Sequence, residues 1–148
     1  MNPTTFFGRM QLPLPKGLEL VEQNPFFARV RQTSYRTDCG VQVQFAAVGY
    51  LQDTSTALTD LKVALLEFRG IPREQISGWE QESGDNQRFT GAYVVNAGPG
   101  GEPPLKGWLS LQRSGGATYF VIFETDPGAW SASEATFKAS AAGVATRN

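Results

Sequence analysis

The sequence predicts an α+β protein in which a twisted, largely antiparallel sheet is packed against two helices, in the manner of an α/β/α sandwich. The strongest observation is the segment 106–126. It has two runs of β-branched and aromatic residues around Ser114-Gly115-Gly116, which is typical of a β-hairpin. Alternating apolar and polar residues predict further strands before it. Helical spacing of apolar residues at mid-chain and again near the end predicts the two helices.

Length and composition favour a single domain. The chain has 148 residues, of which 41% are apolar and 18% charged, so residues 1–148 are expected to fold around one core. Residues 1–16 contain three prolines and show no sustained periodicity. This first segment is therefore expected to be an extended arm.

Three strands are expected before the first helix. A short strand is predicted at 18–23, entered through Pro15-Lys16-Gly17. Residues 26–35 and 41–50 both alternate between apolar and polar side chains, and the polar segment 37–40 separates them. Two alternating runs joined by a short glycine-containing turn predict a second hairpin.

The periodicity then changes. Leu58, Leu61 and Leu65 recur at i, i+3 and i+7, which predicts an amphipathic helix over 56–68. Gly70 and Pro72 follow and are typical of a helix end.

Strands return after this helix. Residues 76–81 predict a short strand that contains Trp79, and residues 89–96 alternate again. The segment 97–104, rich in glycine and proline, is expected to be a loop. The hairpin 106–126 follows it and is expected to form the middle of the sheet that the helices cover.

The chain closes on a predicted helix. Ser131 and Glu134 have the spacing of a capping box, and the apolar residues Phe137, Ala141 and Val144 follow. Because this helix is short and rich in alanine, it must dock on the sheet to be stable. Trp108 lies at the start of the hairpin and Trp130 just past its end. Both are expected to seal the sheet against the helices, and a ligand platform is the alternative.

Several classes of chemistry are excluded by composition. The chain has no histidine, so no Ser-His-Asp or Cys-His catalytic scheme and no histidine metal site can form. The single cysteine, Cys39, permits no intramolecular disulfide and is expected to have no chemical role. Gly98, Gly100 and Gly101 precede a strand rather than a helix, which is unlike a phosphate-binding loop. No cofactor is therefore expected.

Charge and hydropathy limit the partners. The net charge of −1 gives no general attraction to nucleic acid or to an anionic membrane. No segment reaches the roughly 20 apolar residues of a membrane helix, and the start lacks the apolar core of a signal peptide. We therefore expect a cytoplasmic protein without membrane insertion.

Carboxylates leave one enzymatic alternative open. Glu80, Glu82 and Asp85 lie close together in the sequence, and Glu102 lies elsewhere. A hydrolase could use two such groups for acid–base chemistry across a cleft. Acidic residues in a polar turn are more often solvated, and that interpretation is preferred.

The first long alternating run offers a surface for a partner. Phe27, Arg29, Arg31 and Tyr35 have the same parity, and Arg36 joins them where the strand has ended. Arginine and aromatic residues are enriched in protein interfaces. Aromatic and arginine side chains also form single-stranded nucleic-acid platforms, but the net charge argues against that use. For this run of residues taken alone, a solvated outer sheet face, with arginine stems covering aromatic rings, is the preferred interpretation.

The order of elements resembles a known fold family. The segments concerned are the entry LPLPKG at 12–17, the helix 57–68, the strands 89–95 and 119–123, and the closing helix with Phe137 and Ser140. In this order they resemble the PsbP-like fold of photosystem PsbP proteins, bacterial DcrB-type proteins and Eag adaptor chaperones of type VI secretion. The family has no common catalytic site, so the resemblance implies a binding or adaptor role.

The sequence thus favours a non-enzymatic protein-binding, adaptor or chaperone module that binds another protein. Two alternatives remain open. One is a structural subunit of a phage or secretion assembly, which would form a homo-oligomer; the other is the carboxylate-dependent hydrolase.

Overall fold

The fold is known from a computed structural model of the chain. The structure describes residues 3–6, 10–13, 18–23, 27–32, 44–52, 55–69, 71, 73–96 and 104–146. These residues form two sheets and two α-helices, with short 3₁₀ turns at Arg73–Gln75 and Pro127–Ala129. The predicted α+β class is confirmed.

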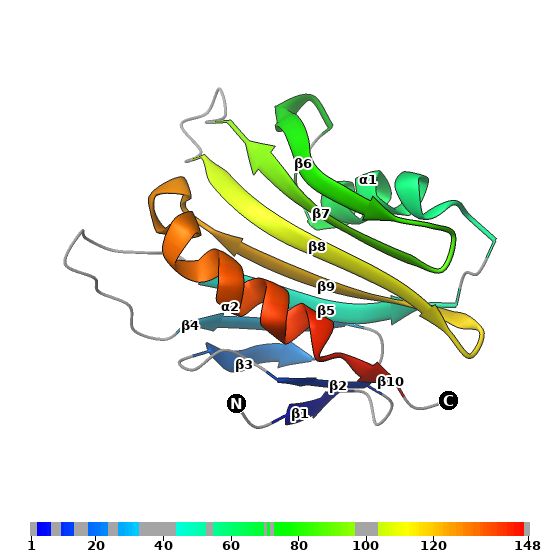
Figure 1. Ribbon diagram of the computed structural model, residues 1–148. Coiled ribbons are helices and arrows are strands. Elements are labelled where there is room, and N and C mark those ends of the chain that lie inside the picture. The colour runs from blue at the N-terminus through cyan, green and yellow to red at the C-terminus, as the bar shows by residue number, and fades with distance from the viewer. Residues whose placement is uncertain are drawn as a thin grey trace.

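A seven-stranded antiparallel sheet is the centre of the molecule (Figure 1). Its strands lie in the order β3-β4-β5-β9-β8-β7-β6. Their bounds are Leu18–Gln23 for β3, Phe27–Gln32 for β4, Gln44–Leu51 for β5, Ile76–Gly84 for β6, Arg88–Val95 for β7, Leu105–Ser114 for β8 and Ala117–Thr125 for β9. Strands β4 and β5 pair as neighbours in an antiparallel register, which confirms the pairing predicted for the second hairpin. The turn predicted at 37–40 lies outside the described residues.

The predicted hairpin 106–126 occupies the position expected for it. Strands β8 and β9 pair from Lys106 opposite Thr125 to Ser114 opposite Ala117. Gly115 and Gly116 make the turn, with φ of +57° and +82°, and glycine adopts these values without the penalty that a Cβ imposes. Strand β9 lies inside the seven-stranded sheet, between β5 and β8, and all of its residues are buried.

The two helices cover opposite faces of this sheet (Figure 1). Helix α1, Leu58–Arg69, contacts β7 and β8 from one side, and helix α2, Trp130–Ala142, contacts β8 and β9 from the other. Helix α1 begins two residues later than expected. Of the helices in the described part of the chain, neither is both long and apolar enough to cross a membrane.

Each helix seals its own hydrophobic cluster. The cluster under α1 contains Leu61 and Leu65 of the helix and Leu109 and Ile122 of the sheet. The cluster under α2 contains Trp108, Trp130, Phe123 and Phe137, with the last two rings stacked at a centroid distance of 4.9 Å. Trp108 and Trp130 are only 7% and 6% exposed, which confirms their sealing role.

A second sheet corrects the prediction for the start of the chain. Strands β1, Pro3–Phe6, and β2, Met10–Pro13, pair with each other, and β2 also pairs with β10, Ala145–Thr146. Met10 and Leu12 are buried in the cluster under α2. An extended arm is therefore the wrong description of the described residues in 1–16. In β2, alternate side chains point into the core. The strand has only four residues, which is too short for this alternation to be recognised in the sequence.

One buried carboxylate lies in the sheet on the α1 side. Glu124 of β9 is 2% exposed and accepts a hydrogen bond from the Tyr93 hydroxyl of β7. Gly107 of β8 lies between them, in register with both. The absent side chain at Gly107 leaves the space that the Tyr93 ring occupies.

Candidate functional site

The candidate site is a part of the sheet beside α2, buried under the helix at one end and left uncovered at the other. Helix α2 contacts β8, β9 and β2, while β7 and β6 extend beyond it on the same face (Figure 1). Register places alternate residues of β7 and β8 on this face, in the pairs 90–110, 92–108, 94–106 and 88–112. We call the following residues the β7–β8 strip: Thr90, Ala92, Val94, Trp108, Ser110 and Gln112.

Strand alternation explains why these side chains are together. In β7, Phe89, Tyr93 and Val95 belong to the α1 cluster, so the intervening residues point to the opposite face. The intervening residues are small or polar and carry no large apolar group that would need a helix above it. Thr90, Val94, Ser110 and Gln112 are half-buried as a result.

Trp108 forms the apolar end of the strip. Its indole is buried with Ala92 in the cluster under α2. The Lys138 ammonium of α2 lies 4.9 Å from the centroid of this ring, and the Lys106 ammonium lies 5.3 Å from the Trp130 ring. Both distances are within the range of cation–π attraction. Lysine stems thus cover the tryptophans and keep the charges at the surface.

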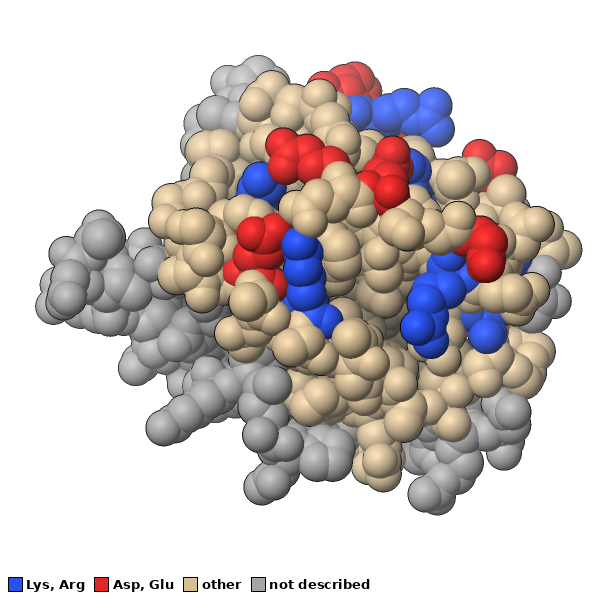
Figure 2. All heavy atoms as spheres, viewed as in Figure 1, with Lys and Arg blue, Asp and Glu red and all other residues tan. Residues whose placement is uncertain are grey.

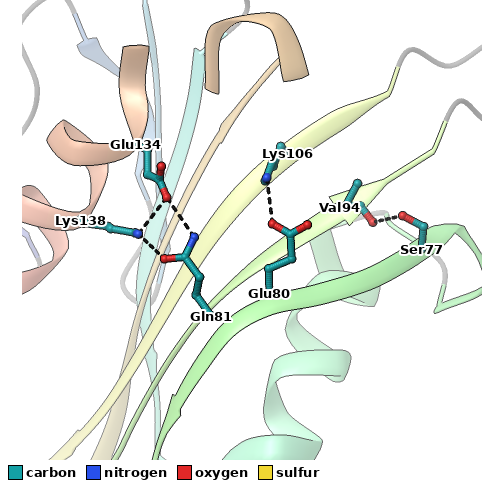
Figure 3. A network of polar contacts seen from close by, with 7 residues as sticks. All are labelled: Ser77, Glu80, Gln81, Val94, Lys106, Glu134 and Lys138. Carbon is teal, nitrogen blue, oxygen red and sulfur yellow. Dashed lines mark hydrogen bonds and ion pairs between the residues drawn. The ribbon is translucent and has the colours of Figure 1, made fainter. Parts of the chain in front are cut away.

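Polar contacts cross from β6 to α2 and β8 at this end (Figure 3). The Gln81 amide donates to Glu134 Oε2 at 3.0 Å and accepts a hydrogen bond from Lys138 Nζ. Glu134 and Lys138 also pair with each other at 2.8 Å, one turn apart on α2. Lys106 pairs with Glu80 at 2.9 Å. The edge strand is therefore tied to the helix above the strip.

Charges surround the strip without filling it. Seen from the α2 side, Figure 2 shows an uncharged and slightly hollowed area at the centre of this face, with red and blue groups around it. At the far end of the strip, Arg88 Nη2 donates to Gln112 Oε1 at 3.2 Å. The surface is thus a polar and partly apolar floor with a charged rim.

The pKa of Glu134 is lowered by its contacts. The hydrogen bond from Gln81 has the larger effect, and the hydrogen bond and charge of Lys138 add to it. A carboxylate with a depressed pKa stabilises the fold above its unfolded pKa, about 4.3, and this contribution is lost as the pH falls through the folded value.

This depression predicts a pH-dependent cost for Glu134→Gln. At pH 7 the variant should lose about 0.3–1 kcal/mol of unfolding free energy, a small value because the side chain is about one third exposed. At pH 2 the difference should be smaller, because this contribution is lost as the pH falls through the lowered pKa of Glu134. Urea unfolding of both proteins at the two pH values measures it, with Glu67→Gln on the exposed side of α1 as the control. An equal cost at both pH values would contradict the prediction.

The residues predicted from sequence as a partner surface fall partly within the structure. Phe27, Arg29 and Arg31 lie on β4, in register with Gly49, Ala47 and Phe45 of β5. Strand β4 ends at Gln32, and Tyr35 and Arg36 lie outside the described residues. The structure thus brings three of the five to one strand, next to the edge strand β3. Their role in binding stays a prediction. Cys39 also lies outside the described residues.

The acidic residues that could serve catalysis bind separate partners. Glu80 pairs with Lys106, and Glu82 accepts a hydrogen bond from Lys62. Asp85 Oδ1 accepts the backbone N–H groups of Gln87 at 2.8 Å and Arg88 at 3.1 Å, which lower its pKa. Glu102 is not among the described residues. Within the described ranges, no three acidic or cysteine side chains are grouped as a metal site would require.

Sequence reasoning misses the contacts around Gln81. The spacing of Ser131 and Glu134 predicts a capping box, but α2 begins at Trp130, follows the 3₁₀ turn directly and has no side-chain cap. Glu134 is therefore inside the helix, where its carboxylate is free to reach Gln81. The i,i+4 spacing of Glu134 and Lys138 is a signal for their pairing. Nothing in the sequence indicates a partner 53 residues away.

Similar folds occur among solved structures. One is the Ran-binding protein Mog1p of Saccharomyces cerevisiae. The superposition covers 93% of this chain and 84% of the Mog1p chain, with a TM-score of 0.60 and 12% sequence identity. Another is LpqN, a Mycobacterium tuberculosis protein involved in cell envelope biogenesis. Here the superposition covers 99% of this chain and 85% of the LpqN chain, with a TM-score of 0.52 and 13% sequence identity. At these identities the likeness shows a shared fold.

Sequence comparison adds no family. No protein-family model matches the chain, and no curated protein matches it. Membership of the PsbP-like family therefore stays a prediction.

Proposed function

We propose that this protein is a non-enzymatic protein-binding module, of the adaptor or chaperone type, and that the β7–β8 strip is its binding surface. The observation that carries the proposal is the uncovered part of the sheet beside α2. Its floor is half-buried, with Trp108 at one end, and its rim is charged.

The chemistry of the strip suits a protein partner. Protein interfaces combine a partly apolar centre, often with tryptophan, with a polar rim that supplies hydrogen bonds. Thr90, Ser110 and Gln112 offer hydroxyl and amide groups on a regular strand spacing, which fits side chains or backbone of a partner segment. The paired charges at the rim can exchange partners at little cost because they are exposed.

The fold comparisons support the same class of function. Mog1p, which shares the fold, is a Ran-binding protein, so it binds another protein. The resemblance to the PsbP-like family, which includes adaptor chaperones, points the same way. Of the four acidic residues considered for a hydrolase, the three that the structure describes bind separate lysines or cap a turn, which favours binding over catalysis.

Site-specific photo-crosslinking tests the proposal and the choice of surface together. A photoreactive phenylalanine analogue would be placed at Ser110 in the strip, at Arg29 on β4, or at Glu67 on the exposed side of α1. Each protein would be irradiated in lysate of the organism of origin, and the adducts identified by mass spectrometry. We expect one recurrent protein adduct at Ser110 that is absent at Glu67.

Substitutions then measure the contribution of the strip. Ser110→Arg introduces a long charged side chain into the floor and should weaken capture of the crosslinked protein at least about tenfold, with the thermal midpoint changed by only a few degrees. Glu67→Arg is the control and should bind normally. A recurrent adduct at Arg29 but not at Ser110 would move the surface to β4, where Arg29→Ala with Arg31→Ala should weaken binding. Adducts that do not differ among the three positions would overturn the proposal.

A further inference from the structure

The bulge of β6 is unusual in its backbone. Gln81 has φ of +56°, and it is the one non-glycine residue with positive φ in the described part of the chain. A side chain in this left-handed region costs free energy because its Cβ crowds the backbone. The residue lies at a register irregularity, since Glu80 pairs with Ala92 whereas Ser83 pairs with Thr90. Strained residues of this kind persist only where other contacts hold them.

The contacts that hold Gln81 come from α2. Its amide bonds to both Glu134 and Lys138, which also bond to each other, so the three side chains form a closed ring of contacts (Figure 3). The Lys106–Glu80 pair joins the same part of β6 to β8. Lys138 is also the residue whose ammonium lies over Trp108.

These contacts are exposed, so each is individually weak. Residues 80–84 of β6 are exposed, and Glu134 and Lys138 are each about one third exposed. Exposed ion pairs and hydrogen bonds contribute little, and in this bulge they offset backbone strain. Strand β6 is an edge strand, held on one side only. The contacts between the β6 bulge and α2 therefore have a small net stability, and β6 has no strand on its outer side. A segment of this kind can open locally while the rest of the sheet stays folded.

We propose that Gln81, Glu134 and Lys138 form a releasable clasp that holds the bulge of β6 against α2. In the open form Gln81 leaves the left-handed region, residues 80–83 separate from α2, and solvent reaches Trp108. The clasp is a property of the free protein and does not rest on the proposed function. If the strip binds a partner, opening would also control access to its apolar end.

Amide hydrogen exchange, followed by NMR on the purified protein, tests the clasp. In the wild type we expect the amides of residues 78–83 and the Trp108 indole N–H to exchange faster than the amides of β9, which report unfolding of the whole sheet. Gln81→Ala and Lys138→Met each break the ring, the second while keeping an apolar stem over Trp108. Each should accelerate exchange at these sites about three- to tenfold. The β9 amides should remain the slower to exchange, at nearly the wild-type rate.

Three further variants keep the test specific. Thr136→Ala changes an exposed residue of α2 outside the ring and should leave exchange unchanged. Gln81→Gly loses the same amide as Gln81→Ala but relieves the left-handed strain, so it should unfold at a higher urea concentration than the alanine variant. The double variant of Gln81→Ala with Lys138→Met should exchange no faster than the faster single variant, because both open the same ring.

Three results would overturn the clasp. One is wild-type exchange in both Gln81→Ala and Lys138→Met. Another is equal acceleration at β6, Trp108 and β9, which would mean general destabilisation. The third is identical exchange of β6 and β9 in the wild type, which would mean that the edge opens only with the whole sheet. Because no partner is needed, a failure of the proposed binding surface would not affect these outcomes.

Discussion

Replacing Gly107 with alanine should strongly destabilise the fold, although it adds only one methyl group. A Cβ at this position would lie 2.5 Å from Tyr93 Oη and 2.6 Å from Cε1 of the same ring, and closer still to Cζ. Tyr93 is fully buried, and its hydroxyl is bonded to Glu124, so the ring has no free direction in which to move. Overpacking of this severity should cost at least about 2 kcal/mol in urea unfolding.

A neighbouring glycine gives the matched control. Gly78 lies in β6 of the same sheet, and a Cβ there would have no atom within 4 Å. Gly78→Ala should therefore change stability by less than about 0.5 kcal/mol or increase it slightly. A double-mutant cycle adds a second check, since Tyr93→Ala removes the clashing ring. The two costs should combine to less than their sum, and simple additivity would contradict the steric explanation.

Phe137→Ala should also destabilise the protein strongly, through a cavity rather than a clash. Phe137 is 1% exposed, and its ring stacks on that of Phe123 with an interplanar angle of 3°. The ring centroid of Trp130, on the same helix, lies 6.2 Å from that of Phe137. Truncation leaves a cavity between α2 and the sheet, and such Phe→Ala changes cost about 3–5 kcal/mol. Because α2 also packs on β2, we expect the small sheet to loosen in the same variant.

Urea unfolding gives the cost, and amide exchange in β2 and β10 shows whether the small sheet is affected. Phe137→Leu is the conservative comparison and should recover more than about half of the lost free energy. Ala139→Ser, at an exposed position of the same helix, should cost less than about 0.5 kcal/mol. If Phe137→Ala cost no more than this control, the docking of α2 would depend on other contacts.

Local pattern is sufficient for the long elements. Regular alternation predicts β7 to β9, and the two glycines between β8 and β9 predict the turn that joins them. The i, i+3, i+7 spacing of leucines predicts α1 within two residues of its start. Each of these signals lies within about a dozen residues, where strand or helix geometry relates neighbouring side chains directly.

Short elements and helix ends are predicted less well. Strand β2 has four residues, too few for a visible period, yet its burial makes it part of the core. The start of α2 differs from the expected one because the 3₁₀ turn at Pro127–Ala129 leads directly into the helix. A side-chain cap at Ser131 therefore has no helix end to cap.

The sequence by itself determined the class of fold, the central hairpin and the two amphipathic helices, because these follow from local periodicity and turn chemistry. Only the tertiary structure decided which face of the sheet each helix covers and how much of β7 and β8 remains open. It also decided that Gln81 meets Glu134 and Lys138, and that Tyr93 reaches Glu124 across Gly107. Such contacts join residues 31 to 57 positions apart. They arise from strand order and helix docking, which depend on the packing of the whole chain rather than on any one segment.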